Sequence, residues 1–81
     1  MERLDQIISI IRNVGELTLS KDLEITGDTD IRTDIGFDSL DMVMIVDELE
    51  ETFGITVEND MVQEIKTVND LCHKVSELLG E

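Results

Sequence analysis

The stretch GFDSLDMVMIVDELEETFG, residues 36–54, contains the clearest structural pattern of the chain. It opens on a polar Gly-Phe-Asp-Ser segment and runs without a break into apolar residues mixed with acids. Apolar residues that recur every three or four positions share one face of an α-helix. We therefore predict a helix that is capped by Asp38, with Asp41 three residues on in a near capping-box arrangement, and that ends near Gly54.

The apolar residues of this helix are expected to form one stripe that faces the core. The stripe consists of Leu40, Val43, Val46, Leu49 and Phe53. These residues are three positions apart as far as Leu49, and the last step is four positions. Met42 and Met44 lie off this stripe. They suit either ordinary packing or a soft surface that contacts a ligand or partner, because methionine side chains are flexible and polarizable. Their place beside Ser39 favours the contact surface.

Two segments precede this helix. Residues 3–14 carry apolar side chains at the spacing of one helix face, and Gly15 follows where a left-handed residue would end a helix. Residues 16–38 mix apolar residues with Thr, Ser, Gly and Asp, and no single period fits them. We interpret them as a long ordered loop, with room for one short helical turn after Ser20, whose apolar residues attach it to the core.

The segment after Gly54 predicts two more helices. Ile55 and Val57 form an extended spacer, residues 59–65 a short helix, and Thr67 with Asp70 a cap for a last helix. That last helix carries Val68, Leu71, Cys72, Val75, Leu78 and Leu79. The predicted fold is all-α: a small bundle of three long helices and one short helix, with a long loop between the first two. No change of composition divides residues 1–81, which we expect to form one domain.

The charge of the chain narrows its possible partners. Twenty acidic and six basic residues give a formal net charge of −14. Such a chain has no basic stripe to neutralise phosphates, so we expect no nucleic-acid or anionic-membrane binding, whereas basic protein patches are attracted. The sequence shows no signal peptide or transmembrane run, and its one cysteine forms no internal disulfide. We expect a cytoplasmic monomer.

The chain offers little material for catalysis. Cys72 and His73 are adjacent, and adjacent helical residues point about 100° apart, so they do not form a nucleophilic pair. We expect Cys72 in the core and His73 in solvent. The acids between Asp28 and Asp38 fit no calcium-loop register, since the position that requires glycine falls on Thr33 in the better one. Neither an enzyme nor a metal site is predicted.

Ser39 is the remaining candidate. A serine at a helix start is most often a structural cap, but Asp38 can fill that role here. The Ser39 hydroxyl is then free in the first helical turn. An anionic phosphodiester attached to it would gain from the unpaired N–H groups and the dipole of the helix N-terminus.

The motif DIGFDSLDMV, residues 34–43, followed by LEETFGITV, residues 49–57, resembles the acyl carrier protein family. The hallmark of that family is Asp-Ser-Leu after a glycine, at the head of an acidic second helix. The resemblance extends from ITGDTDIRTDIG, which begins at Ile25, to IKTVNDL in the last helix. Carriers of the family are bundles of three long helices and one short helix, the layout already predicted.

The resemblance implies a role for each matching residue. Ser39 would carry 4′-phosphopantetheine, and Asp38 and Leu40 would be read by the phosphopantetheinyl transferase that installs it. Basic patches of acyl-transfer and synthase enzymes would meet a docking face made of Asp41, Met44, Asp47, Glu48, Glu50 and Glu51. The implied acyl pocket consists of Val43, Val46, Leu49 and Ile65. The carrier itself would present acyl groups without catalysing their reactions.

Three departures bear on the pathway. Met44 stands where fatty-acid carriers usually have glutamate, Phe37 replaces a common alanine, as in many polyketide carriers, and residues 16–24 are longer than the usual connection. We expect a standalone carrier that holds acyl intermediates as thioesters for fatty-acid, polyketide, aminoacyl or another specialised acyl synthesis. The alternative is an acidic helical interaction module without a prosthetic arm, in which Ser39 only starts a helix.

Overall fold

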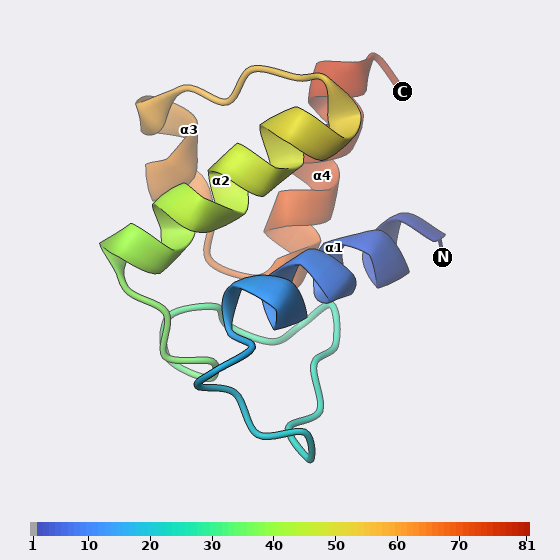
Figure 1. Ribbon diagram of the computed structural model, residues 1–81. Coiled ribbons are helices and arrows are strands. Elements are labelled where there is room, and N and C mark those ends of the chain that lie inside the picture. The colour runs from blue at the N-terminus through green and yellow to red at the C-terminus, as the bar shows by residue number, and fades with distance from the viewer. Residues whose placement is uncertain (1) are drawn as a thin grey trace.

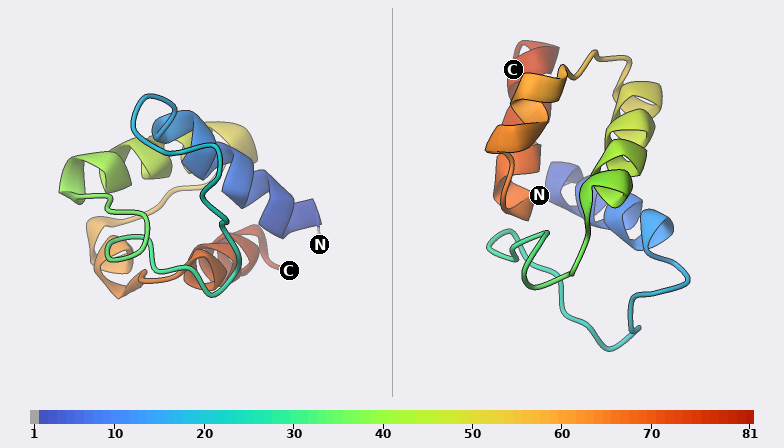
Figure 2. Two further views of the ribbon diagram at one scale, coloured as in Figure 1. Left: turned by 90° about the horizontal axis from the view of Figure 1, so that it is seen from below. Right: turned by 90° about the vertical axis from the view of Figure 1, so that its left-hand side faces the viewer.

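The computed structural model describes residues 2–81 and shows an all-α fold (Figure 1). Its helices are α1 (Glu2–Val14), α2 (Ser39–Phe53), α3 (Asn59–Glu64) and α4 (Val68–Leu79). α1, α2 and α4 pack on one another, and the loop of residues 15–38 crosses one end of the bundle (Figure 2). Three long helices, one short helix and a long first loop confirm the predicted fold. Within the described chain, no helix is long and apolar enough to cross a membrane.

The long loop is fixed to the core, as predicted. Ile31 is fully buried, and its N–H donates to the Lys66 carbonyl at 2.8 Å. The Val68 N–H donates to the Thr29 carbonyl at 3.1 Å, which ties the same loop to the start of α4. The loop also buries Ile25, Ile35 and Phe37. Each large apolar side chain removed from water contributes about 1.5–3 kcal/mol, which holds in place a segment without helical structure of its own.

Gly15 does not have the left-handed conformation expected for it. The glycines with positive φ in the described residues are Gly36, Gly54 and Gly80. A Cβ on Gly15 would lie 2.6 Å from Leu19 Cδ1 and 2.9 Å from Phe37 Cζ. Glycine at this position thus allows Leu19 and Phe37 to pack closely against the backbone, and any larger residue would displace these side chains. Gly54, with φ of 68°, ends α2 as predicted.

The buried face of α2 differs from the predicted stripe. Leu40 is 68% exposed and Val43 54% exposed, whereas the buried residues are Met42, Ile45, Val46 and Leu49. A step of three residues turns about 300° around a helix, so a stripe built on such steps drifts by about 60° at each one. Leu40 and Val43 thus rotate away from the core. Met42, 1% exposed, packs in the core and is not the exposed surface residue that was expected.

Candidate functional site

The head of α2 is built by a reciprocal cap. Asp38 has extended backbone, and its Oδ1 accepts a hydrogen bond from the Asp41 N–H at 3.0 Å. Asp41 Oδ2 accepts from the Asp38 N–H at 3.2 Å. This capping box satisfies backbone donors that an α-helix leaves unpaired at its N-terminus. The predicted cap is confirmed, and it leaves the next residue, Ser39, without that task.

The cap depends on an ionised Asp38. The Asp41 N–H holds the pKa of the Asp38 carboxyl below its ordinary value. A carboxyl with a lowered folded-state pKa contributes stability above its ordinary pKa and loses it as pH falls through the lower value. The head of α2 is therefore in its capped form throughout the neutral range.

Ser39 is the first residue of α2, and its side chain is exposed. Within the described residues, the Ser39 hydroxyl forms no hydrogen bond, because Asp38 supplies the cap. The following residue, Leu40, presents most of its side chain to solvent. An accessible hydroxyl beside an exposed leucine can carry a substituent without disturbing the packing of the helix.

A cavity of about 330 Å³, here called the Ser39 groove, opens beside this serine between α2 and α3. Its walls mix apolar and polar side chains: Arg32, Ser39, Met42, Val43, Val46, Asp47, Glu50, Val57, Asn59, Val62 and Gln63. Of the predicted acyl pocket, Val43 and Val46 line this groove. Leu49 and Ile65 do not line it, and both are buried in the hydrophobic core. Leu49 is one three-residue step beyond Val46, and that step turns it toward the core.

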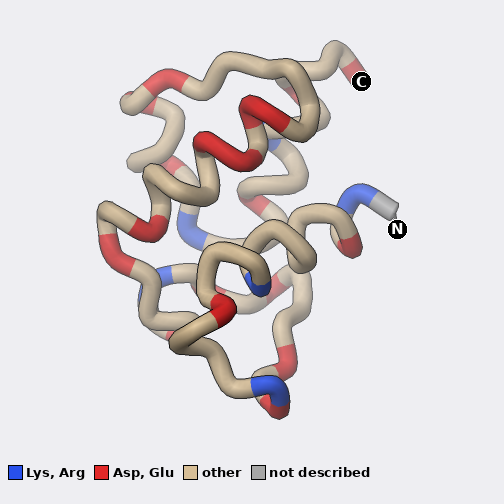
Figure 3. Tube along the Cα trace, in the orientation of Figure 1, with Lys and Arg blue, Asp and Glu red and all other residues tan. Residues whose placement is uncertain are grey.

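The acids predicted as a docking face divide into two groups. Asp41 belongs to the cap, and Glu50 Oε2 accepts a hydrogen bond from the Val57 N–H at 2.9 Å, which ties the segment after α2 back to the helix. Asp47, Glu48 and Glu51 are exposed, and Figure 3 shows the acids following one another along α2. In the ion pairs of the described chain the basic partners are Arg3 and Lys74, and their acidic partners are Glu64, Glu77 and Glu81. The carboxylates of Asp47, Glu48 and Glu51 therefore form no ion pair within the described chain.

A second hollow lies on the side of α2 that faces α1. It has a volume of about 490 Å³, and Met44, Val14 and Leu17 are among the residues that line it. Met44 is 42% exposed and Leu17 is 97% exposed. Met44 is therefore a surface residue, as predicted. Leu17 belongs to an aperiodic stretch, where no pattern distinguishes an exposed leucine from one that packs on the core.

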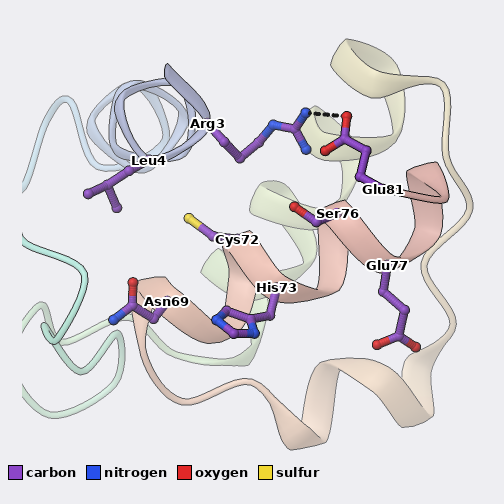
Figure 4. Close-up of a pocket in the computed structure, with 8 residues that line it drawn as sticks. All are labelled: Arg3, Leu4, Asn69, Cys72, His73, Ser76, Glu77 and Glu81. Carbon is purple, nitrogen blue, oxygen red and sulfur yellow. Dashed lines mark hydrogen bonds and ion pairs between the residues drawn. The ribbon is translucent and has the colours of Figure 1, made fainter. Parts of the chain in front are cut away.

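Cys72 lies at the edge of a wider hollow of about 530 Å³ between α1 and α4 (Figure 4). It is half-buried and packs against the core, and this burial raises the pKa of its thiol. Figure 4 shows His73 directed away from Cys72, so the two do not form a catalytic pair. Within the described residues, no group of His, Cys, Asp and Glu is placed to hold a metal ion.

Residues 5–75 match the family described as the phosphopantetheine attachment site. The chain is 40% identical to acyl carrier protein 2, chloroplastic, of Hordeum vulgare, over 99% of this chain and 60% of that protein. It is 34% identical to the acyl carrier protein of Exiguobacterium sibiricum, over 80% of this chain and 82% of that protein. The chain spans less than two thirds of the length of its plant relatives.

The fold matches a solved structure as well. A candidate acyl carrier protein from Mycobacterium tuberculosis superposes with a TM-score of 0.80 and 29% sequence identity. The match covers 93% of this chain and 96% of that chain. The shared arrangement therefore includes nearly every element described above.

Proposed function

This chain belongs to the acyl carrier protein family, and from that membership we propose that it holds acyl intermediates as thioesters on a 4′-phosphopantetheine arm attached to Ser39. One observation carries the choice of residue. Ser39 is exposed at the head of α2, inside the segment that matches the attachment-site family, and its hydroxyl forms no hydrogen bond within the described residues. Carriers of this family are not enzymes, and the chemistry belongs to their partners.

The head of α2 fits such an arm. The Ser39 hydroxyl can form the phosphodiester, the Asp38 cap does not depend on that hydroxyl, and the Ser39 groove gives the arm an adjacent surface. When bound, the arm supplies the thiol on which acyl groups are carried. The chain's own residues hold the arm at one end of α2 and present it beside the exposed side chain of Leu40.

Membership of the family implies a phosphopantetheinyl transferase and acyl synthesis enzymes as partners. We propose that the transferase reads Asp38 and Leu40, and that basic patches of all these enzymes meet a docking face of Met44, Asp47, Glu48 and Glu51. The exposure of these four residues supports the proposal. Asp41 and Glu50 add negative charge beside this face while their carboxylates hold backbone N–H groups.

The cargo is proposed to enter the Ser39 groove. Val43 and Val46 supply apolar walls there together with Met42, Val57 and Val62. Polar side chains at the same groove also suit a polar or short acyl group. We therefore propose that the carrier serves fatty-acid synthesis or a specialised acyl, polyketide or aminoacyl pathway. Phe37 is buried in the core and does not line the Ser39 groove.

We propose further that residues 1–81 act as one monomeric domain in the cytoplasm. The shared core of α1, α2, α4 and the long loop supports a single domain. The single half-buried cysteine suits a reducing compartment.

Intact mass spectrometry tests the proposed function. The purified chain is incubated with coenzyme A and a broad-specificity phosphopantetheinyl transferase, and a second carrier that is known to be loaded serves as the control. We expect the mass of the chain to rise by one phosphopantetheine group. An unchanged mass, in a reaction that loads the control, would favour the acidic interaction module without an arm.

A further inference from the structure

The Ser39 groove contains one basic side chain that the fold does not use. Among the described residues that line the groove, Arg32 is the only lysine or arginine. It is exposed, and its guanidinium belongs to none of the ion pairs or side-chain hydrogen bonds of the described chain. Arg32 thus presents a positive charge at a surface that is otherwise acidic.

The backbone of Arg32 is fixed, although its side chain is not. Asp30 Oδ1 accepts hydrogen bonds from the N–H groups of Arg32 at 2.9 Å and Thr33 at 2.8 Å. The preceding residue, Ile31, is fully buried and bonded to the Lys66 carbonyl. This turn therefore places Arg32 at the groove whether or not the guanidinium has a partner.

Other arginines of the chain support the fold. Arg3 pairs with Glu81 at 2.9 Å and lies over the ring of Phe53, 5.0 Å from its centre. Arg12 donates to the carbonyls of Ser20 and Leu23. Arg32 makes no such contact, although the chain has a net charge of −14 and many acids. Its position at the groove therefore suggests a role other than support of the fold.

The positive charge of Arg32 would stabilise an arm attached to Ser39. Its phosphodiester is an anion, and it would enter a region that already holds Asp38, Asp41 and Asp47. Like charges in one region repel, and a nearby cation offsets this cost. A planar guanidinium can donate two parallel hydrogen bonds to phosphate oxygens, which makes arginine especially suitable.

We propose that Arg32 binds the phosphate of the arm on Ser39 and holds the beginning of the arm at the mouth of the Ser39 groove. This proposal rests on the proposed function, because it requires a loaded Ser39. Arg32 acts as a positioning residue and takes no part in attaching the arm or in reactions of the cargo. Arg32 could also bind a carboxylate of the cargo, but the test excludes that role. Protein loaded with the arm and no acyl group contains the phosphate but no cargo carboxylate.

The test compares the loaded and unloaded forms of wild type, Arg32→Gln, Arg32→Lys and Lys21→Gln. Lys21→Gln is the matched control, because it removes one positive charge from an exposed site of the same loop that does not line the groove. Loading uses coenzyme A and the transferase, and intact mass confirms its completion. The two readouts are the ³¹P chemical shift of the phosphodiester and the melting temperature of the loaded form minus that of the unloaded form.

We expect Arg32→Gln to shift the ³¹P resonance. It should also lower the melting-temperature difference by about 2–4 °C at low salt, which is the effect expected for the loss of one surface ion pair in a domain this small. The temperature effect should shrink at high salt through screening. Arg32→Lys should retain most of it, because the charge remains. Lys21→Gln should resemble wild type in both readouts, and the unloaded variants should all melt like the unloaded wild type.

Three outcomes would overturn the proposal, two of them with Ser39 loaded and one without loading. If Arg32→Gln matches wild type in both ³¹P shift and melting-temperature difference, or if Lys21→Gln has an equal effect, Arg32 does not bind the phosphate, although Ser39 is loaded. If no form gains the mass of the arm, the proposed function fails and the role of Arg32 fails with it. Intact mass distinguishes a failure of loading from a failure of Arg32 to bind the phosphate.

Discussion

Replacing Ser39 with alanine is expected to abolish loading with phosphopantetheine and to leave the melting temperature within about 2 °C of the wild-type value. Loading requires the hydroxyl oxygen, for which alanine has no substitute. The fold does not require it, because Asp38 and Asp41 cap α2 without using Ser39. Alanine is also a better helix former than serine. Intact mass and thermal unfolding by circular dichroism measure the two effects.

Ser9→Ala is the matched control for this substitution. Ser9 is also an exposed serine on a helix, and its hydroxyl forms no hydrogen bond within the described residues. This variant should load as wild type does. Loading of Ser39→Ala would assign the arm to another residue, and unfolding of Ser39→Ala would show that the hydroxyl has a structural role that the capping box does not replace.

Reversal of three exposed acids of α2 should slow loading strongly. Asp47→Lys, Glu48→Lys and Glu51→Lys combined are expected to reduce the second-order rate constant with the transferase about tenfold or more at low salt, because a charged surface steers association with a basic partner. These carboxylates form no ion pair in the described chain, so their reversal should spare the fold. Loading rates measured at 0.05 M and 0.5 M salt test the expectation, and the difference from wild type should narrow as salt increases.

The control carries an equal change of charge elsewhere. Asp5→Lys, Asp22→Lys and Glu24→Lys combined alter exposed acids of α1 and the long loop. Equal slowing by both triple variants would mean that net charge acts as a whole, and the docking face would be rejected. Glu50 is left unchanged, because loss of its bond to the Val57 N–H would leave a partly buried donor unsatisfied, at a cost of about 1–3 kcal/mol.

The sequence predicts the ends of the helices better than their faces. The caps at Asp38 with Asp41 and at Thr67 with Asp70 were both predictable, because each depends on side chains three residues apart in one segment. The buried face of α2 was predicted only in part. Neighbouring residues of a helix point about 100° apart, so an error of one position selects a residue on another face. The face of α2 that is buried depends on how α1, α4 and the loop pack against it.

The same division applies to the site. Ser39 could be proposed from its local motif, because the cap at Asp38 and the start of the helix both depend on residues that are close in the sequence. Glu50 could not be separated from its acidic neighbours, since its partner is the Val57 backbone, seven residues away. Arg32 and the far wall of the groove depend on how the long loop and α3 meet α2, which no periodicity in the loop reveals.

Fragmentation mass spectrometry of the loaded wild-type chain determines directly which residue carries the arm. We expect the whole added mass on the peptide that contains Ser39, and fragment ions that place it on that residue. Ser9, Ser20, Ser76 and the threonines should remain unmodified. Added mass on any of those residues, with Ser39 unmodified, would contradict the assignment of Ser39 as the residue that carries the arm.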